Sequence, residues 1–178
     1  MRSEMLADGH IWLRVAQAEW TDPLDTAFAA HVGGRWNLPA SFPTLYLNED
    51  IVTARINMQL FTAAWPYGPE DLLDATAPVV VEAMLPRQQR VADAHSPKGI
   101  NALGLPKTYP LDASGAPVPR RVCQPIGAAV HAARLRGVRS RSAQSALGAG
   151  RELAWFPATA RSVARAGARL PFSQWFWS

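Results

Sequence analysis

A short loop in the first quarter of the chain has the residue types of a ligand-binding site. Two glycines, Gly33 and Gly34, are followed by a cation, a large ring and an amide at Arg35, Trp36 and Asn37. Glycine lets the backbone turn sharply and approach a ligand closely, and an arginine fork matches the oxygens of a phosphate or a ribose. The same order of residues also describes an ordinary surface turn, so the loop alone does not establish a site.

Three further residues could complete a site for a phosphorylated small molecule that carries a ring. Tyr46, like Trp36 of the loop, offers a flat surface for stacking on a heterocycle, while Asn57 and Ser142 offer hydrogen bonds to hydroxyl groups. Asn57 lies close to the apolar face of a predicted helix, so we expect its amide to point into the protein and find partners there. A structural amide bonded to a neighbouring loop would show the same pattern.

Several common site types are absent from the sequence. It has no GxxxxGK[ST] phosphate loop, no GxGxxG turn, no GxSxG elbow and no paired cysteines or histidines at zinc-ligand spacing. Cys123 has no histidine beside it, and His95 has no second ligand at a useful spacing. We therefore expect no bound metal, no cysteine nucleophile, and a surface position for His95.

Composition indicates a single domain in a reducing compartment. A chain of 178 residues can bury a core without disulfides, and it has one cysteine. No segment has the pattern of a signal peptide or a membrane span, so we expect a cytoplasmic protein. The net charge of +4 comes from scattered cations with one concentration over residues 134–141, which leaves direct nucleic-acid binding as a weaker alternative.

Apolar patterns predict an α+β fold of short strands with a few helices and long loops, in one domain over residues 1–178. Alternating or short apolar runs predict strands over residues 11–15, 44–47, 78–85, 138–143 and 153–156. The intervening segments 65–77, 87–99 and 106–119 have the composition of loops.

Two helices and a packed tail complete the prediction. Helical spacing begins at Ile51, with Asn48 as the expected N-cap and Glu49 and Asp50 in the first turn. A second helix is expected over residues 125–136, with a proline in its first turn and a glycine as its stop. The tail over residues 158–178 ends in Phe172, Trp175, Phe176 and Trp177, which should pack on the domain or on a partner.

The ordered motifs resemble the RES domain family, toxins of RES–Xre toxin–antitoxin modules that are named after an Arg, a Glu and a Ser. The resemblance covers about residues 10–157 in order. The matching text is IWLRV and DPLD near the start, then GGRWN, LYL and TARIN, and finally GVRSRSA. The first half, with its GGRWN loop, following strand and helix, is the more specific part.

The resemblance implies an ADP-ribosyltransferase-like fold and action on NAD as a substrate. The nicotinamide–ribose bond would be split by phosphorolysis or hydrolysis, or ADP-ribose would be passed to a protein. The implied partner is an Xre-type antitoxin, and a homo-oligomer is left open. Implied catalytic residues are Arg35, Tyr46, Asn57 and Ser142, and implied ligand contacts are Gly34, Arg35, Trp36, Asn37, Tyr46 and Ser142.

The family Glu falls on Asn57, which carries no charge and is one methylene shorter. A carboxylate near the ribose would stabilise the positive charge that develops as nicotinamide leaves, and loss of such a contact costs about two to three orders of magnitude in rate. Three accounts remain open at this stage. Glu49, Glu82 or Glu152 substitutes for the missing carboxylate; the enzyme is slow or differently selective; or the protein binds a nucleotide without turning it over.

Overall fold

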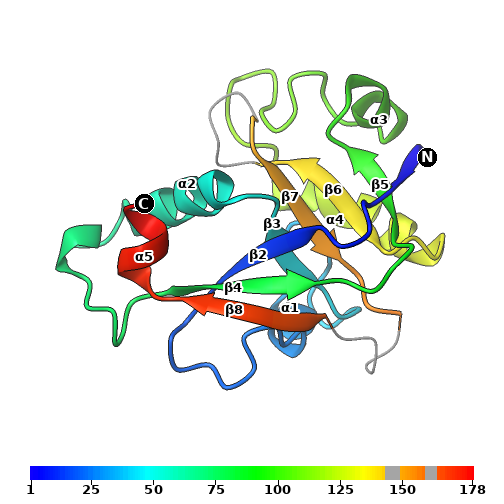
Figure 1. Ribbon diagram of the computed structural model, residues 1–178. Helices are drawn as coiled ribbons and strands as arrows, with labels where there is room; N and C mark the ends of the chain where they lie inside the picture. Colours follow the sequence, from blue (N-terminus) through cyan, green and yellow to red (C-terminus); the bar gives the residue numbers. More distant parts are fainter. Residues whose placement is uncertain (143–148, 159–163) are drawn as a thin grey trace.

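A computed structural model describes residues 1–142, 149–158 and 164–178 of the chain, and all described strands belong to one mixed sheet (Figure 1). The strand order is β1-β5-β6-β7-β3-β2-β4-β8, in which β5 and β6 pair parallel and the other neighbours pair antiparallel. The strands are β1 Ser3–Met5, β2 Ile11–Ala16, β3 Leu45–Asn48, β4 Val79–Met84, β5 Arg90–Ala94, β6 Gly137–Arg141, β7 Arg151–Trp155 and β8 Arg165–Leu170. The predicted single α+β domain is confirmed.

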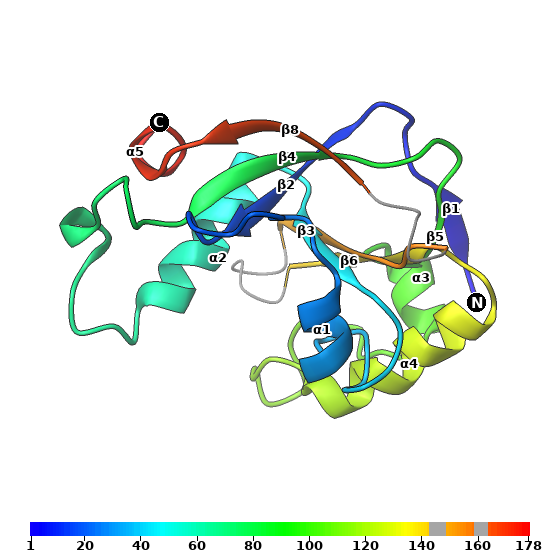
Figure 2. The same ribbon diagram turned by 90° about the horizontal axis from the view of Figure 1, so that it is seen from below.

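Five α-helices, within the described ranges, cover different parts of the sheet. They are α1 Ala27–Val32, α2 Ile51–Thr62, α3 Pro97–Ala102, α4 Arg120–Ala132 and α5 Phe172–Phe176, with one 3-10 turn at Pro69–Asp71. Figures 1 and 2 show α2 and α5 side by side at one end of the molecule, with α3 and α4 at the other end. The centre of the sheet, β7 and β3, lies between these two groups of helices.

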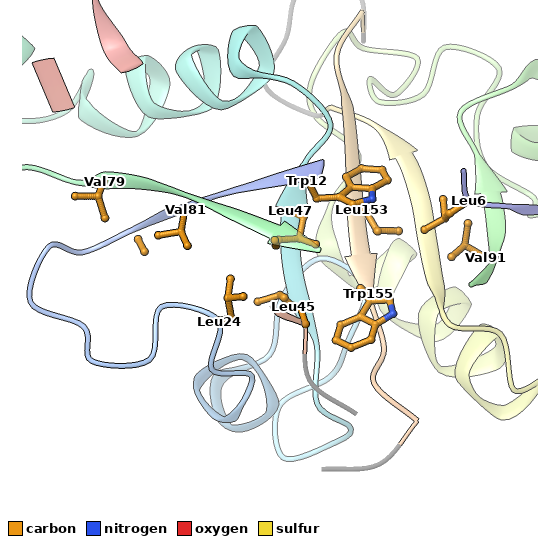
Figure 3. Packing of buried hydrophobic residues seen from close by; sticks show 13 residues of the cluster. Leu6, Trp12, Leu24, Leu45, Leu47, Val79, Val81, Val91, Leu153 and Trp155 are labelled. Carbon is orange, nitrogen blue, oxygen red and sulfur yellow. The ribbon is translucent and has the colours of Figure 1, made fainter. Parts of the chain in front are cut away.

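The strands predicted from apolar runs form because their side chains fill a shared core. Leu45 and Leu47 of β3, with Leu153 and Trp155 of β7, pack in a cluster that also holds Trp12 (Figure 3). These five side chains are at most 2% exposed, and apolar burial of this kind is the main favourable term in folding. The strands predicted over 11–15, 44–47, 78–85, 138–143 and 153–156 are all present, although Ala143 lies outside the described residues.

The start of α2 differs from the prediction. Asn48 is the last residue of β3, where its Nδ2 donates to the Leu13 carbonyl at 3.2 Å. The N-cap is Asp50, whose carboxylate accepts the Thr53 amide at 2.7 Å. Glu49 lies before the helix and pairs with Arg139 of β6. The prediction failed because Asn and Asp are equally good caps, and only strand pairing decides where the strand ends.

Residues 87–99 form β5 and the start of α3, so the predicted loop was wrong there. The segment looks polar because Asp93 lies in the strand, yet this residue is 3% exposed. Its carboxylate accepts the backbone amides of Ser96 at 2.9 Å and His95 at 3.1 Å, and it pairs with Arg2 at 3.1 Å. A buried carboxylate with these partners is compatible with a strand that has neighbours on both sides, as β5 has in β1 and β6.

The second predicted helix starts earlier and ends earlier than expected. It spans Arg120–Ala132, and Pro125 lies inside it rather than in its first turn. Cys123, Gly127 and Val130 are buried at helical spacing, which extends the apolar face upstream of the proline. Gly137 does not end the helix but begins β6, where a side chain would meet the carbonyl oxygen of Ala154 at 2.3 Å.

The tail becomes part of the domain in its described residues 164–178; the segment 159–163 lies outside them. Strand β8 pairs with β4, and α5 buries Phe172, Trp175 and Phe176 against the cluster that includes Met58 of α2. The Arg55 guanidinium donates to the Trp175 carbonyl at 2.9 Å and so ties α5 to α2. None of the helices in the described part of the chain is both long and apolar enough to cross a membrane.

Candidate functional site

The Gly33–Asn37 loop follows α1 and is held against β3 by one tyrosine. The Tyr46 hydroxyl accepts the Trp36 backbone amide at 2.8 Å and donates to Asn37 Oδ1 at 2.8 Å. A Cβ atom at Gly34 would lie 2.4 Å from this hydroxyl oxygen, so the close approach requires glycine. Burial raises the pKa of Tyr46 to about 12, which keeps the hydroxyl protonated and able to donate.

The side chains of Trp36 and Asn37, at the end of the loop, point into the protein interior and do not line the pocket. Trp36 is 1% exposed, and its carbonyl oxygen would be 1.7 Å from a side chain at Gly127, so α4 packs directly on the loop. Asn37 is fully buried and donates to the Ala29 carbonyl at 2.6 Å. The stacking and ligand contacts predicted for these two residues are therefore not available in this arrangement, because their side chains are used in packing.

A pocket of about 700 Å³ lies beside the loop and takes in Gly34, Arg35, Tyr46 and Asn57. Its charged lining, within the described residues, consists of Arg14, Arg35 and Arg120 with a single carboxylate, Glu152. The excess of positive charge suits an anionic ligand. The apolar part of the wall includes side chains that are partly open to solvent, namely Trp20, Phe28, Val32 and Leu60.

The three arginines reach the pocket from different elements. Arg35 Nη1 donates to the Val118 carbonyl at 2.8 Å, which fixes one side of its fork. Arg14 of β2 donates to the Tyr46 carbonyl at 3.2 Å and lies 5.7 Å from the centre of the Trp20 ring. Burial lowers the pKa of Arg14, and Asp25 and Asp22 act in the opposite direction. Arg120 is exposed at the start of α4.

Strand register places a carboxylate beside an amide at one wall of the pocket. Asn48 of β3 is directly opposite Glu152 of β7 in the antiparallel ladder. Side chains of such a pair project from the same face of the sheet and lie close together. Ser142, just after β6, donates through Oγ to Glu152 Oε1 at 2.8 Å. The alternation of β3 and β7 thus turns Leu47 and Leu153 into the core and turns Asn48 and Glu152 toward the pocket.

Helix α2 adds Asn57 to this group, as its position near the apolar face predicted. Asn57 Nδ2 donates to Asn48 Oδ1 at 2.7 Å and to Glu152 Oε1 at 2.9 Å. Ser142 Oγ also lies 3.2 Å from Asn57 Oδ1. We refer to Asn48, Asn57, Ser142 and Glu152 as the polar cluster.

The polar cluster surrounds a carboxylate that is only partly exposed to solvent. Burial raises the pKa of Glu152, while the hydrogen bonds from Ser142 and Asn57 and the charge of Arg35 act in the opposite direction. Both donors converge on Oε1. Among the residues that the structure describes, no donor contacts Oε2, so this second oxygen is the one left for a ligand.

The two other carboxylates considered from the sequence lie elsewhere. Glu49 pairs with Arg139, and Glu82 accepts the Ala168 backbone amide at 3.1 Å next to strand β8. Neither is among the pocket-lining residues. His95 is partly buried rather than at the surface and lies 2.8 Å from Glu4, also outside the pocket lining. Over the described residues, no group of His, Cys, Asp and Glu could hold a metal ion.

The cation concentration over residues 134–141 does not form a single exposed patch. Arg139 pairs with Glu4 at 3.3 Å and with Glu49. Arg141 donates to the carbonyls of His95 and Tyr109, both at 2.9 Å. These contacts place the two guanidinium groups in ion pairs and loop contacts, which weakens the case for a nucleic-acid surface at this segment.

Sequence patterns found part of the site and missed the rest. They brought forward Arg35, Tyr46, Asn57 and Ser142; the first three line the pocket, and Ser142 joins Asn57 within the polar cluster. The pocket-lining residues Arg14, Asn48 and Arg120 were not assigned to the site, and Asn48 was expected only as a helix N-cap. The alternation in residues 11–15 was a usable signal for Arg14, since a cation on a half-buried strand needs a partner or a ligand.

Comparisons with known proteins agree with this fold. The sequence profile of the RES domain matches residues 11–174. The structure is similar to a chain in the crystal structure of the M. tuberculosis MbcT–MbcA toxin–antitoxin complex, with a TM-score of 0.74 and 20% sequence identity. That alignment covers 98% of this chain and 92% of the other. The search of curated proteins found no significant match to the sequence.

The contact between Tyr46 and the loop can be tested by removing one oxygen atom. Tyr46→Phe leaves the Trp36 amide and Asn37 Oδ1 without their partner, so we expect the free energy of unfolding to fall by about 1–3 kcal/mol. Chemical denaturation measures the change. Tyr67→Phe, at a side chain that is 47% exposed, is the control and should change the value by less than about 0.5 kcal/mol. Equal effects of the two variants would contradict the assignment.

Proposed function

The chain belongs to the RES domain family, and from this premise we propose that it is an enzyme that consumes NAD by cleaving the nicotinamide–ribose bond. The observation that carries the proposal is the cationic pocket beside the Gly33–Asn37 loop. Its three arginines suit the diphosphate of a dinucleotide, and its volume of about 700 Å³ falls in the range of small-molecule sites.

Each part of the pocket suits one part of such a ligand. Guanidinium groups bind phosphate oxygens in forked geometry, which supports Arg35 and Arg14 as phosphate contacts. The apolar wall around Trp20 and Phe28 suits a flat heterocycle. The polar cluster offers hydrogen bonds for the hydroxyl groups of a ribose. These complementarities support a nucleotide with two phosphates better than a simple anion.

The proposed reaction needs little covalent chemistry from the protein. The bond from ribose C1′ to the pyridinium nitrogen breaks, its electron pair leaves with neutral nicotinamide, and the positive charge moves to the ribose. An oxygen of water or phosphate then forms the new bond to C1′, and attacking water releases its proton. The protein contributes by holding the ribose and by placing complementary charge beside it.

We also propose that the protein acts as a toxin with an antitoxin partner of the Xre type. The fold is shared with a chain of a toxin–antitoxin complex, which supports the idea that a second protein covers the pocket. Exposed apolar side chains at the pocket wall, such as Phe28 at 65% and Leu60 at 49%, would be shielded by such a partner. The cytoplasm, where NAD is available, is the proposed location.

NAD consumption can be tested with purified protein and one variant pair. We expect nicotinamide release with NAD, and Arg35→Gln should lower kcat/KM about ten- to hundredfold because a charged hydrogen bond to phosphate is lost. Arg134→Gln, at an exposed arginine outside the pocket lining, is the matched control and should behave like wild type. Absence of release above a buffer blank, with and without phosphate and at high enzyme concentration, would refute the proposal.

A second candidate function is nucleotide binding without turnover, and the neutral Asn57 favours it. It predicts that the wild-type protein binds NAD in calorimetry but releases no nicotinamide. It further predicts that Asn57→Glu, which restores a carboxylate on α2, gains activity. An active wild-type protein would rule out this candidate.

A further inference from the structure

We infer that Glu152 of β7 is the carboxylate that stabilises positive charge on the ribose, and that Asn57 is a positioning residue for it. This inference rests on the proposed cleavage of NAD. The resemblance to the family implies a carboxylate at the position of Asn57 on α2, whereas the carboxylate that lines the pocket here is on β7. The observation behind it is the direct contact of the Asn57 amide with Glu152 Oε1 at 2.9 Å.

Glu152 differs from the other acidic residues in its position in the pocket wall. It is the one carboxylate in the described lining of a pocket that holds Arg14, Arg35 and Arg120. In a pocket with arginines alone, a developing cation at the ribose would be disfavoured, because like charges repel. The negative charge at Glu152 therefore gives the site a place where such a cation is stabilised.

The hydrogen bonds leave one carboxylate oxygen for the substrate. Ser142 Oγ and Asn57 Nδ2 both donate to Oε1, and in the described part of the chain nothing donates to Oε2. Asn57 is in turn held by Asn48 Oδ1 at 2.7 Å. The polar cluster thus orients the carboxylate from behind, and Oε2 is free to accept a ribose hydroxyl or to face the developing charge.

The amide at residue 57 and the carboxylate at residue 152 depend on each other. A Glu in place of Asn57 would bring a second carboxylate to within hydrogen-bond distance of Glu152. Two ionised carboxylates at that distance repel each other, so one of them would favour its protonated form. The neutral side chain of Asn57 on α2 therefore allows Glu152 on β7 to remain ionised. On this account Asn57 is not a lost catalytic group but the partner of a relocated one.

A charge-only substitution with a rescue tests the inference. Glu152→Gln keeps an Oε1 acceptor for Ser142 and Asn57, so we expect an unchanged fold by circular dichroism and a kcat for nicotinamide release that is lower by about two to three orders of magnitude. Adding Asn57→Glu to Glu152→Gln moves the carboxylate to α2 and should recover at least about tenfold of the lost rate. Glu82→Gln is the matched control, because Glu82 is a carboxylate outside the pocket lining.

The single Asn57→Glu variant sharpens the outcome. We expect it to be slower than wild type, because Glu152 is still present beside the new carboxylate. An active wild type with full activity in Glu152→Gln would overturn the inference and leave the proposed function standing. A wild type that releases no nicotinamide would overturn both.

The pH dependence gives a readout that a purely structural role would not produce. Burial raises the pKa of Glu152 above its ordinary 4.5, and the ionised form is the one that stabilises a cation. As pH falls through this raised value, the carboxylate takes up a proton and kcat should decline. We expect this acid limb in wild type, measured by nicotinamide release, and its loss in Glu152→Gln. An identical acid limb in both proteins would contradict the assignment.

Discussion

The contact between Asn57 and Glu152 joins the helix and the sheet that build the pocket. A carboxylate that is partly removed from water is destabilising unless donors surround it, and here Asn57 and Ser142 both donate to one of its oxygens. Asn57 can reach the carboxylate only if α2 lies beside the position where Asn48 of β3 and Glu152 of β7 pair. The position of α2 is therefore constrained by one charged group as well as by apolar packing.

Strand β3 connects the stability of the core to the geometry of the site. Leu45 and Leu47 point into the main core, and Tyr46 and Asn48 project from the other face toward the loop and the polar cluster. Because side chains alternate strictly along a strand, a shift by one residue would exchange these two sets. Burial of the leucines thus fixes where the tyrosine hydroxyl and the amide lie.

Patterns within short segments of the sequence predicted the features of the fold that depend on short segments alone. Apolar runs predicted five of the eight described strands, and the helical spacing before Asn57 predicted the direction of its amide. Strand β5 escaped prediction because Asp93 looks like a loop residue until its partners from Ser96 and Arg2 are known. The sequence raised Glu152 only as one of three carboxylates, since its place depends on the register between β3 and β7, which no local pattern encodes.

The polar cluster draws on two distant parts of the chain, with Asn48 and Asn57 in the first and Ser142 and Glu152 in the second. Contacts between such distant residues form slowly, because the entropy cost of closing a long loop comes before the contacts can stabilise the chain. The pocket is complete only when β7 is paired between β6 and β3, a pairing that also completes the centre of the sheet. A chain with α2 and the loop in place but β7 unpaired would therefore lack the carboxylate of its pocket.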